Sequence, residues 1–238
     1  MHAAAQAAVG RGDDALAPDR LGEAHDPVRD QLGVLDHVGR VADHARQDRL
    51  ALRQLDDPAI AENWDQIVPE PSVEDYKRFT MKRVEALNHA IRGLPTERIR
   101  FHLCWGSWHG PHVTDIPMKD IVDVMLAINA GAYSFEAANV RHEHEWRVWQ
   151  DAKLPEGKKI LPGVVSHSTN VVEHPELVAE RILRFADGVG AENVIASTDC
   201  GLGGRVHPQI AWAKLESLVE GARLASERLS SSRAGAGA

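Results

Sequence analysis

Two cysteines, a histidine and a glutamate stand at the ends of apolar segments that we expect to form strands. Segment 99–104 alternates apolar and polar residues, so a strand would place His102 and Cys104 on one face. Glu136 ends another such segment, and Cys200 follows a third. Two thiolates, an imidazole and a carboxylate form a tetrahedral ligand set that suits Zn²⁺. One shared ion also requires the two sulfur atoms to lie within about 8 Å, because a zinc–sulfur bond measures about 2.3 Å.

Each of these residues also has an ordinary structural explanation. A histidine and a cysteine on one strand can simply belong to the core, and Glu136 can pair with Arg100 or Arg141. A buried carboxylate is costly unless it meets a cation, and either a metal ion or an arginine would supply one. Residues 142–145 (His-Glu-His-Glu) lack the His-Glu-x-x-His spacing of zinc proteases, so we interpret them as a charged helix start beside the site.

The elements that would position these residues alternate between strands and helices. From residue 50 to 229, short β-like runs are separated by longer amphipathic segments, which indicates βα units around a parallel sheet. Ser72 is a plausible helix N-cap and Pro117 fits a first helical turn. The helices that follow the first, second and fourth strands can end at glycines, namely Gly93, Gly131 and Gly188. The expected strands are 50–55, 99–104, 132–136, 160–166 and 194–198.

Five βα units are too few to close a (β/α)8 barrel, which leaves an open five-stranded sheet as the alternative. In both architectures, ligands gather at the carboxyl ends of the parallel strands. The candidate ligands stand at these ends.

Composition and charge exclude several classes of protein. The 238 residues are 43% hydrophobic and 26% charged, with a net charge of -8, as in ordinary globular proteins. No apolar run approaches the roughly 20 residues that cross a bilayer, and the amino terminus lacks a secretion-signal pattern. We therefore expect a cytoplasmic protein without a membrane partner. The acidic balance argues against nucleic-acid binding, and the oligomeric state is left open.

The first fifty residues differ in composition from the rest. They contain no Lys, Ile, Asn, Ser, Thr, Cys or aromatic residue and are crowded with Asp, Arg, Ala and His. Such a segment offers little to bury. We expect residues 1–50 to be an atypical extension, either disordered or non-native, followed by a barrel portion over 51–229. Residues 230–238 are rich in Ser, Gly and Ala, which favours a flexible tail.

From about Leu50 onward, the sequence resembles the catalytic barrel of cobalamin-independent methionine synthases and their single-barrel relatives, which include epoxyalkane:coenzyme M transferases. The resemblance covers about the last five of eight βα units and implies an α/β fold of the TIM-barrel type. The family's first three units have no counterpart. The matching motifs occur in the family's order: Gln54-Leu55-Asp56-Asp57-Pro58-Ala59, His102-Leu103-Cys104, Phe135-Glu136, Leu161-Pro162-Gly163-Val164 leading to His167, and Asp199-Cys200-Gly201.

The resemblance also implies an activity and a role for individual residues. The activity is zinc-dependent transfer of a methyl group from a reduced folate to a thiol such as homocysteine, as in a 5-methyltetrahydropteroyltriglutamate–homocysteine S-methyltransferase of methionine biosynthesis. Epoxide opening by a thiol such as coenzyme M and an inactive truncated remnant are the alternatives. The implied roles are zinc ligand for His102, Cys104, Glu136 and Cys200, proton donor for His167, and substrate-binding carboxylate for Asp56 and Glu62.

The implied chemistry follows from the acidity of thiols. A free thiol has a pKa near 8.5, so little thiolate is present at neutral pH, and zinc coordination removes the proton. The thiolate then attacks an electrophilic carbon of the methyl or alkyl donor. When the leaving group is an amine, it must be protonated as the bond breaks, and His167 is expected to supply that proton.

Overall fold

The computed structural model describes residues 53–105 and 114–236. These residues belong to a compact unit that begins at Leu50. Segment 1–50 lies outside the description, so the expectation for it stays a prediction. Within the described ranges, none of the helices combines the length and apolar character that a membrane crossing requires.

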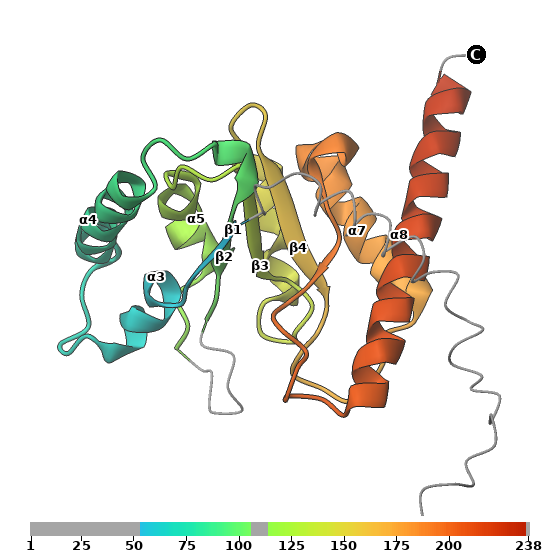
Figure 1. Cartoon of the computed structure of the whole chain (residues 1–238), viewed down its shortest axis with the longest axis horizontal. Coiled ribbons are helices and arrows are strands. Elements are labelled where there is room, and N and C mark those ends of the chain that lie inside the picture. Colours follow the sequence, from blue (N-terminus) through green and yellow to red (C-terminus); the bar gives the residue numbers. More distant parts are fainter. Residues whose placement is uncertain (1–52, 106–113, 237–238) are drawn as a thin grey trace, which may run out of the picture. The chain divides into compact units, whose positions relative to one another are not determined.

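Five parallel strands form one sheet in sequential order, β1-β2-β3-β4-β5 (Figure 1). Every strand therefore pairs with the next one along the chain, and all carboxyl ends lie at the same edge. Consecutive βα units in a (β/α)8 barrel have this order. The bounds are β1 (Arg53–Asp57), β2 (Ile99–Leu103), β3 (Ala132–Glu136), β4 (Lys159–Val165) and β5 (Ser197–Thr198).

The predicted strands are all present, but their bounds differ at the two edges of the sheet. β1 continues to Asp57 because β2 provides pairing up to Leu103. Asp56 and Asp57 therefore lie within the first strand and not after it. β5 has only two residues, because the pairing shifts between Gly163 and Val165 of β4, and its predicted start survives as an isolated bridge.

The helices follow the strands as predicted, with corrections at their ends. The Ser72 hydroxyl accepts a hydrogen bond from the Asp75 backbone and caps α4. Pro117 precedes α5 instead of lying in its first turn. α7 passes Gly188 and ends before Gly190, whose φ of 88° suits glycine. The bounds are α3 (Ala59–Glu62), α4 (Val73–Ala90), α5 (Met118–Leu126), α6 (Val148–Asp151), α7 (Pro175–Val189) and α8 (Pro208–Ala236).

Helix α8 also includes most of the segment that the composition assigns to a tail. It reaches Ala236, and Ser230, Ser231 and Ser232 each donate a side-chain hydrogen bond to the carbonyl four residues earlier. Four short 3-10 helices complete the described elements: η1 (Asn63–Gln66), η2 (Thr96–Arg98), η3 (Glu143–Arg147) and η4 (Ala191–Asn193).

The core lies between the sheet and its helices. Phe101 and Leu103 of β2 and Tyr133 and Phe135 of β3 are fully buried in a cluster with apolar residues of α4 and α5. A second cluster joins β4 to α7 and α8, which pack side by side (Figure 1). Because side chains alternate along a strand, the opposite face of β2 and β3 carries the polar residues of the site.

Gly163 of β4 lets the residue that follows β5, Asp199, pack closely against β4. A Cβ atom at this position would collide with the backbone and carboxylate of Asp199. We expect Gly163→Ala to lower the free energy of unfolding by at least about 2 kcal/mol, because backbone cannot give way as a flexible side chain can. Urea unfolding measures this change. Gly203→Ala is the control, since a Cβ there meets nothing within 4 Å, and an equal loss in both variants would contradict this explanation.

Candidate metal centre

The structure brings three of the four predicted ligands into one cluster. His102 lies in β2, Cys104 follows that strand directly, and Cys200 follows β5. One ligand atom of each residue lies within 4.8 Å of the other two. The two sulfur atoms thus meet the distance that a shared ion requires. His102 and Cys104 are buried, and Cys200 is half-buried.

The imidazole of His102 has one nitrogen engaged and one available. Nδ1 lies 3.1 Å from the hydroxyl oxygen of Ser134 on the neighbouring strand. Nε2 is buried and has no hydrogen-bond partner among the described residues. If Nδ1–H donates to Ser134, Nε2 carries the lone pair that metal ions bind. The hydrogen bond to Ser134 then fixes the orientation of the ring. Leaving a buried nitrogen unsatisfied costs about 1–3 kcal/mol, so this orphaned atom fits a metal ligand.

Glu136 approaches the cluster from the end of β3. Its Oε1 lies 3.9 Å from Cys104 Sγ, and its Oε2 accepts a hydrogen bond of 2.6 Å from the Asn139 amide. Burial, and next the neighbouring Cys104, raise the pKa of Glu136 to about 7. The arginines that offered an alternative ion pair have other partners: Arg100 donates to Gln54, and Arg141 pairs with Asp115.

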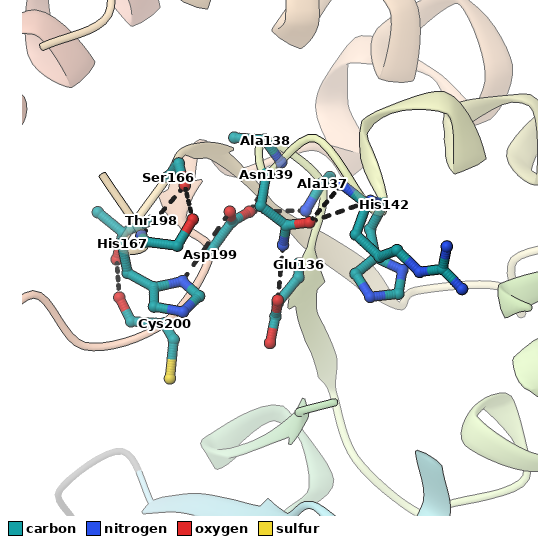
Figure 2. Close-up of polar contacts among 12 residues, drawn as sticks. Glu136, Ala137, Ala138, Asn139, His142, Ser166, His167, Thr198, Asp199 and Cys200 are labelled. Carbon is teal, nitrogen blue, oxygen red and sulfur yellow. Dashed lines mark hydrogen bonds and ion pairs between the residues drawn. The ribbon is translucent and has the colours of Figure 1, made fainter. Parts of the chain in front are cut away.

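Asp199, directly before Cys200, connects two strand ends. Its Oδ1 accepts hydrogen bonds from the backbone N–H groups of Ala137 and Ala138, at 2.7 and 2.8 Å (Figure 2). Its Oδ2 lies 4.0 Å from Nδ1 of His167. Burial, followed by the nearby Glu136 carboxylate, raises the pKa of Asp199 to about 8. The side chain therefore holds the turn after Glu136 while it faces the predicted proton donor.

Arg181 of α7 holds the same turn from the helix side. Its guanidinium donates to the carbonyl oxygens of Val164 and Ala138, at 3.0 and 3.4 Å. It also pairs with Glu143 at 3.0 Å. The sequence gives no sign of this role, because a charged residue in an amphipathic helix normally faces water.

The His-Glu-His-Glu segment is a 3-10 helix start beside the site, as predicted, but its first histidine is buried. Nδ1 of His142 lies 3.0 Å from Glu145, and Nε2 lies 3.5 Å from Asp115. The ring stacks on Trp105, with 4.3 Å between centroids. The two carboxylates and the indole fix His142 as a connection between the segments around residues 115 and 145.

The predicted substrate carboxylates lie on and after β1. Asp56 is exposed and is the register partner of His102, so both side chains point to the same face of the sheet. Asp57 accepts a hydrogen bond of 2.9 Å from the backbone N–H of Ala59, the first residue of α3. Glu62 ends α3 and is half-buried.

Comparison with known proteins gives the family of this fold and cluster. Residues 41–224 match the family model described as "Cobalamin-independent synthase, Catalytic domain". The chain belongs to this family. It is similar to a 2-hydroxypropyl-CoM lyase from Xanthobacter autotrophicus, with 25% identity over 175 residues, 63% of this chain and 46% of that protein. It is also similar to a methionine synthase from Saccharolobus solfataricus, with 27% identity over 164 residues, 68% of this chain and 44% of that protein.

A solved structure shows the same fold. The B12-independent methionine synthase from a Shewanella species superposes with a TM-score of 0.59 and 21% identity, covering 82% of this chain and 54% of that chain. The predicted α/β fold of the TIM-barrel type is therefore confirmed. The chain spans about half the length of these relatives.

The two contacts of Asp199 with the turn after Glu136 give a testable stability difference. At pH 7 a carboxyl with a pKa of about 8 is mostly neutral, so Asp199→Asn resembles it and retains an oxygen acceptor. We expect Asp199→Asn to change the free energy of unfolding of the metal-free protein by less than about 1 kcal/mol. Asp199→Ala should lower it by about 2–4 kcal/mol, because two buried N–H groups lose their acceptor. Urea unfolding of both variants provides the measurement, and equal losses would refute the assignment.

Proposed function

We propose that this protein is a zinc-dependent thiol alkyltransferase that moves a methyl group from a reduced folate to a thiol such as homocysteine. The observation that carries the proposal is the convergence of His102, Cys104 and Cys200 within 4.8 Å at the carboxyl ends of the strands. Membership of the cobalamin-independent synthase family and similarity to a protein named methionine synthase support it. A cytoplasmic role in methionine biosynthesis belongs to the same proposal.

The donor set fits zinc, with His102, Cys104, Glu136 and Cys200 as the residues that would hold it. Sulfur and imidazole ligands suit this metal. His102 Nε2, which has no hydrogen-bond partner among the described residues, and the raised pKa of Glu136 both fit a site that binds a cation. When bound, zinc keeps a substrate thiol deprotonated at neutral pH, which makes it nucleophilic.

The surrounding residues bind the substrates and move the proton. Nδ1 of His167 lies 4.0 Å from Asp199 Oδ2, and we assign Nε2 as the atom that gives a proton to the leaving amine. The Asp199 carboxyl, whose Oδ2 lies 4.0 Å from the ring nitrogen, is the neighbouring group that would limit the orientation of the His167 imidazole. Asp56, on the same face as His102, and Glu62 would bind the ammonium or N–H donors of the substrates. His167 is buried, which favours a proton transfer shielded from water.

A second activity uses the same residues. The similarity to a 2-hydroxypropyl-CoM lyase favours thiol alkylation by an epoxide, in which no amine leaves. An inactive remnant is the third alternative. Parallel assays with methyltetrahydrofolate plus homocysteine and with an epoxide plus coenzyme M separate the two activities. A remnant would bind zinc without releasing protons when thiol is added.

Substitutions within the site should separate metal binding from transfer. We expect Cys104→Ser and Cys200→Ser to lower bound zinc at least tenfold, because each removes a thiolate ligand. His167→Asn should retain zinc and thiol-dependent proton release but lose about 10²–10⁴-fold in methyl transfer, the range for general acid catalysis. Metal analysis and product formation measure both effects. His89→Asn, on the exposed end of α4, is the control. Full transfer activity in His167→Asn would reject the proton-donor role.

A further inference from the structure

A buried ion pair, Lys214–Glu173, lies next to the turn that carries His167, outside the metal cluster. Lys214 of α8 has no exposed surface. Its ammonium donates to Glu173 Oε2 at 2.8 Å and to the Val171 carbonyl at 2.6 Å. One turn further along the helix, Ser217 donates to the Glu173 carbonyl. Two side chains of helix α8 thus hold the segment 171–173, through the backbone carbonyls of that segment and through the carboxylate of Glu173.

Glu173 continues the connection to the turn that carries His167. Its Oε1 accepts a hydrogen bond of 2.8 Å from the backbone N–H of Ser166, which is buried. The hydroxyl of Ser166 in turn accepts a hydrogen bond from the Ser168 backbone at 3.2 Å. Both neighbours of His167 are therefore fixed by a chain of contacts that begins at the Lys214 ammonium.

We propose that Lys214 and Glu173 are positioning residues that set the location of the His167 ring for proton transfer. The inference rests on the proposed function of His167. A buried ion pair gives little net stability compared with an apolar pair of similar size, because both charges lose their water. The pair does orient the Glu173 carboxylate: Lys214 holds one of its oxygens, so the other oxygen faces the backbone N–H of Ser166. A displacement of about 1 Å in a catalytic group can reduce the rate about 10²-fold.

Two double variants separate the effect of the Ser166 hydrogen bond from the effect of the two buried charges. Glu173→Leu with Lys214→Met replaces the ion pair by an apolar pair and removes the acceptor of Ser166. Glu173→Gln with Lys214→Met is also neutral but retains an amide oxygen for that N–H. Arg223→Met, which loses exposed ion pairs on the same helix, is the control. Using double variants avoids a buried charge without its partner, which could prevent folding.

Three measurements on the zinc-loaded full chain give the result. These are kcat and the thiol KM of methyl transfer, thiol-dependent proton release, and the NMR signals of ¹⁵N-labelled histidine rings, with His167 assigned from His167→Asn. We expect the Leu/Met variant to lose about 10²-fold in kcat, with thiol KM and proton release unchanged and the His167 signals shifted. The Gln/Met variant retains an acceptor for the Ser166 N–H but loses the ammonium that orients it, so it should fall between the parent and the Leu/Met variant in kcat and in the shift of the His167 signals. Arg223→Met should remain within about threefold of the parent in kcat and show the parent His167 signals.

The outcomes separate this inference from the proposed function. Unchanged kcat and unchanged His167 signals in the Leu/Met variant would overturn the inference. Equal losses of proton release and kcat would also overturn it, because they indicate a general structural role. If the parent protein binds thiol but transfers no methyl group, the proposed function fails. The His167 signals then decide by themselves whether Lys214 and Glu173 position the ring.

Discussion

The side chain of Asp199 joins two strand ends that lie far apart in the sequence. Its carboxyl group accepts from the turn after β3 and faces His167 after β4, although Asp199 itself follows β5. Gly163 makes this arrangement possible, because any side chain there would occupy the space of Asp199. The adjacent Cys200 is thereby brought to His102 and Cys104 of the second βα unit. The geometry of the candidate site thus depends on one buried carboxyl group.

Around this contact, buried polar groups form hydrogen bonds with the candidate ligands and fix their side chains. Ser134 engages one nitrogen of His102, and Asn139 engages one oxygen of Glu136. The other nitrogen of His102 has no hydrogen-bond partner among the described residues, and the other oxygen of Glu136 lies 3.9 Å from Cys104 Sγ and accepts a hydrogen bond of 3.4 Å from the Trp105 backbone. Buried polar groups are costly unless they are paired, so such a network favours one arrangement of the site over others. Arg181 and the Lys214–Glu173 pair extend the same principle to the helices α7 and α8.

The sequence predicted the parts of this structure that depend on local patterns. β3 has the predicted bounds, because its residues alternate strictly between the helix-covered face and the site. β5 is shorter than its apolar run, since the pairing shifts between Gly163 and Val165 of β4 and Val194 pairs only through an isolated bridge. Gly188 looked like a helix stop, but it lies within α7 where a Cβ would press on the Trp149 carbonyl. Its role is close packing between helices, which a single sequence cannot distinguish from a helix end.

The site was predicted in part for the same reason. Strand alternation places His102 and Cys104 together, and parallel strand ends bring Cys200 to them. The supporting residues are distant in sequence from what they support: Lys214 lies 41 residues from Glu173, and Asp199 lies 62 residues from Ala137. Such pairs follow from tertiary packing, and neither charge nor spacing indicates them.

The central claim is that His102, Cys104, Glu136 and Cys200 hold one zinc ion to which a substrate thiol is added. Zinc-edge X-ray absorption of the metal-loaded protein, recorded with and without homocysteine, tests it most directly. The account predicts a shell of two sulfur and two nitrogen or oxygen atoms, with zinc–sulfur distances of about 2.3 Å, and a third sulfur atom when homocysteine is present. A shell without two sulfur atoms, or one that homocysteine leaves unchanged, would contradict it.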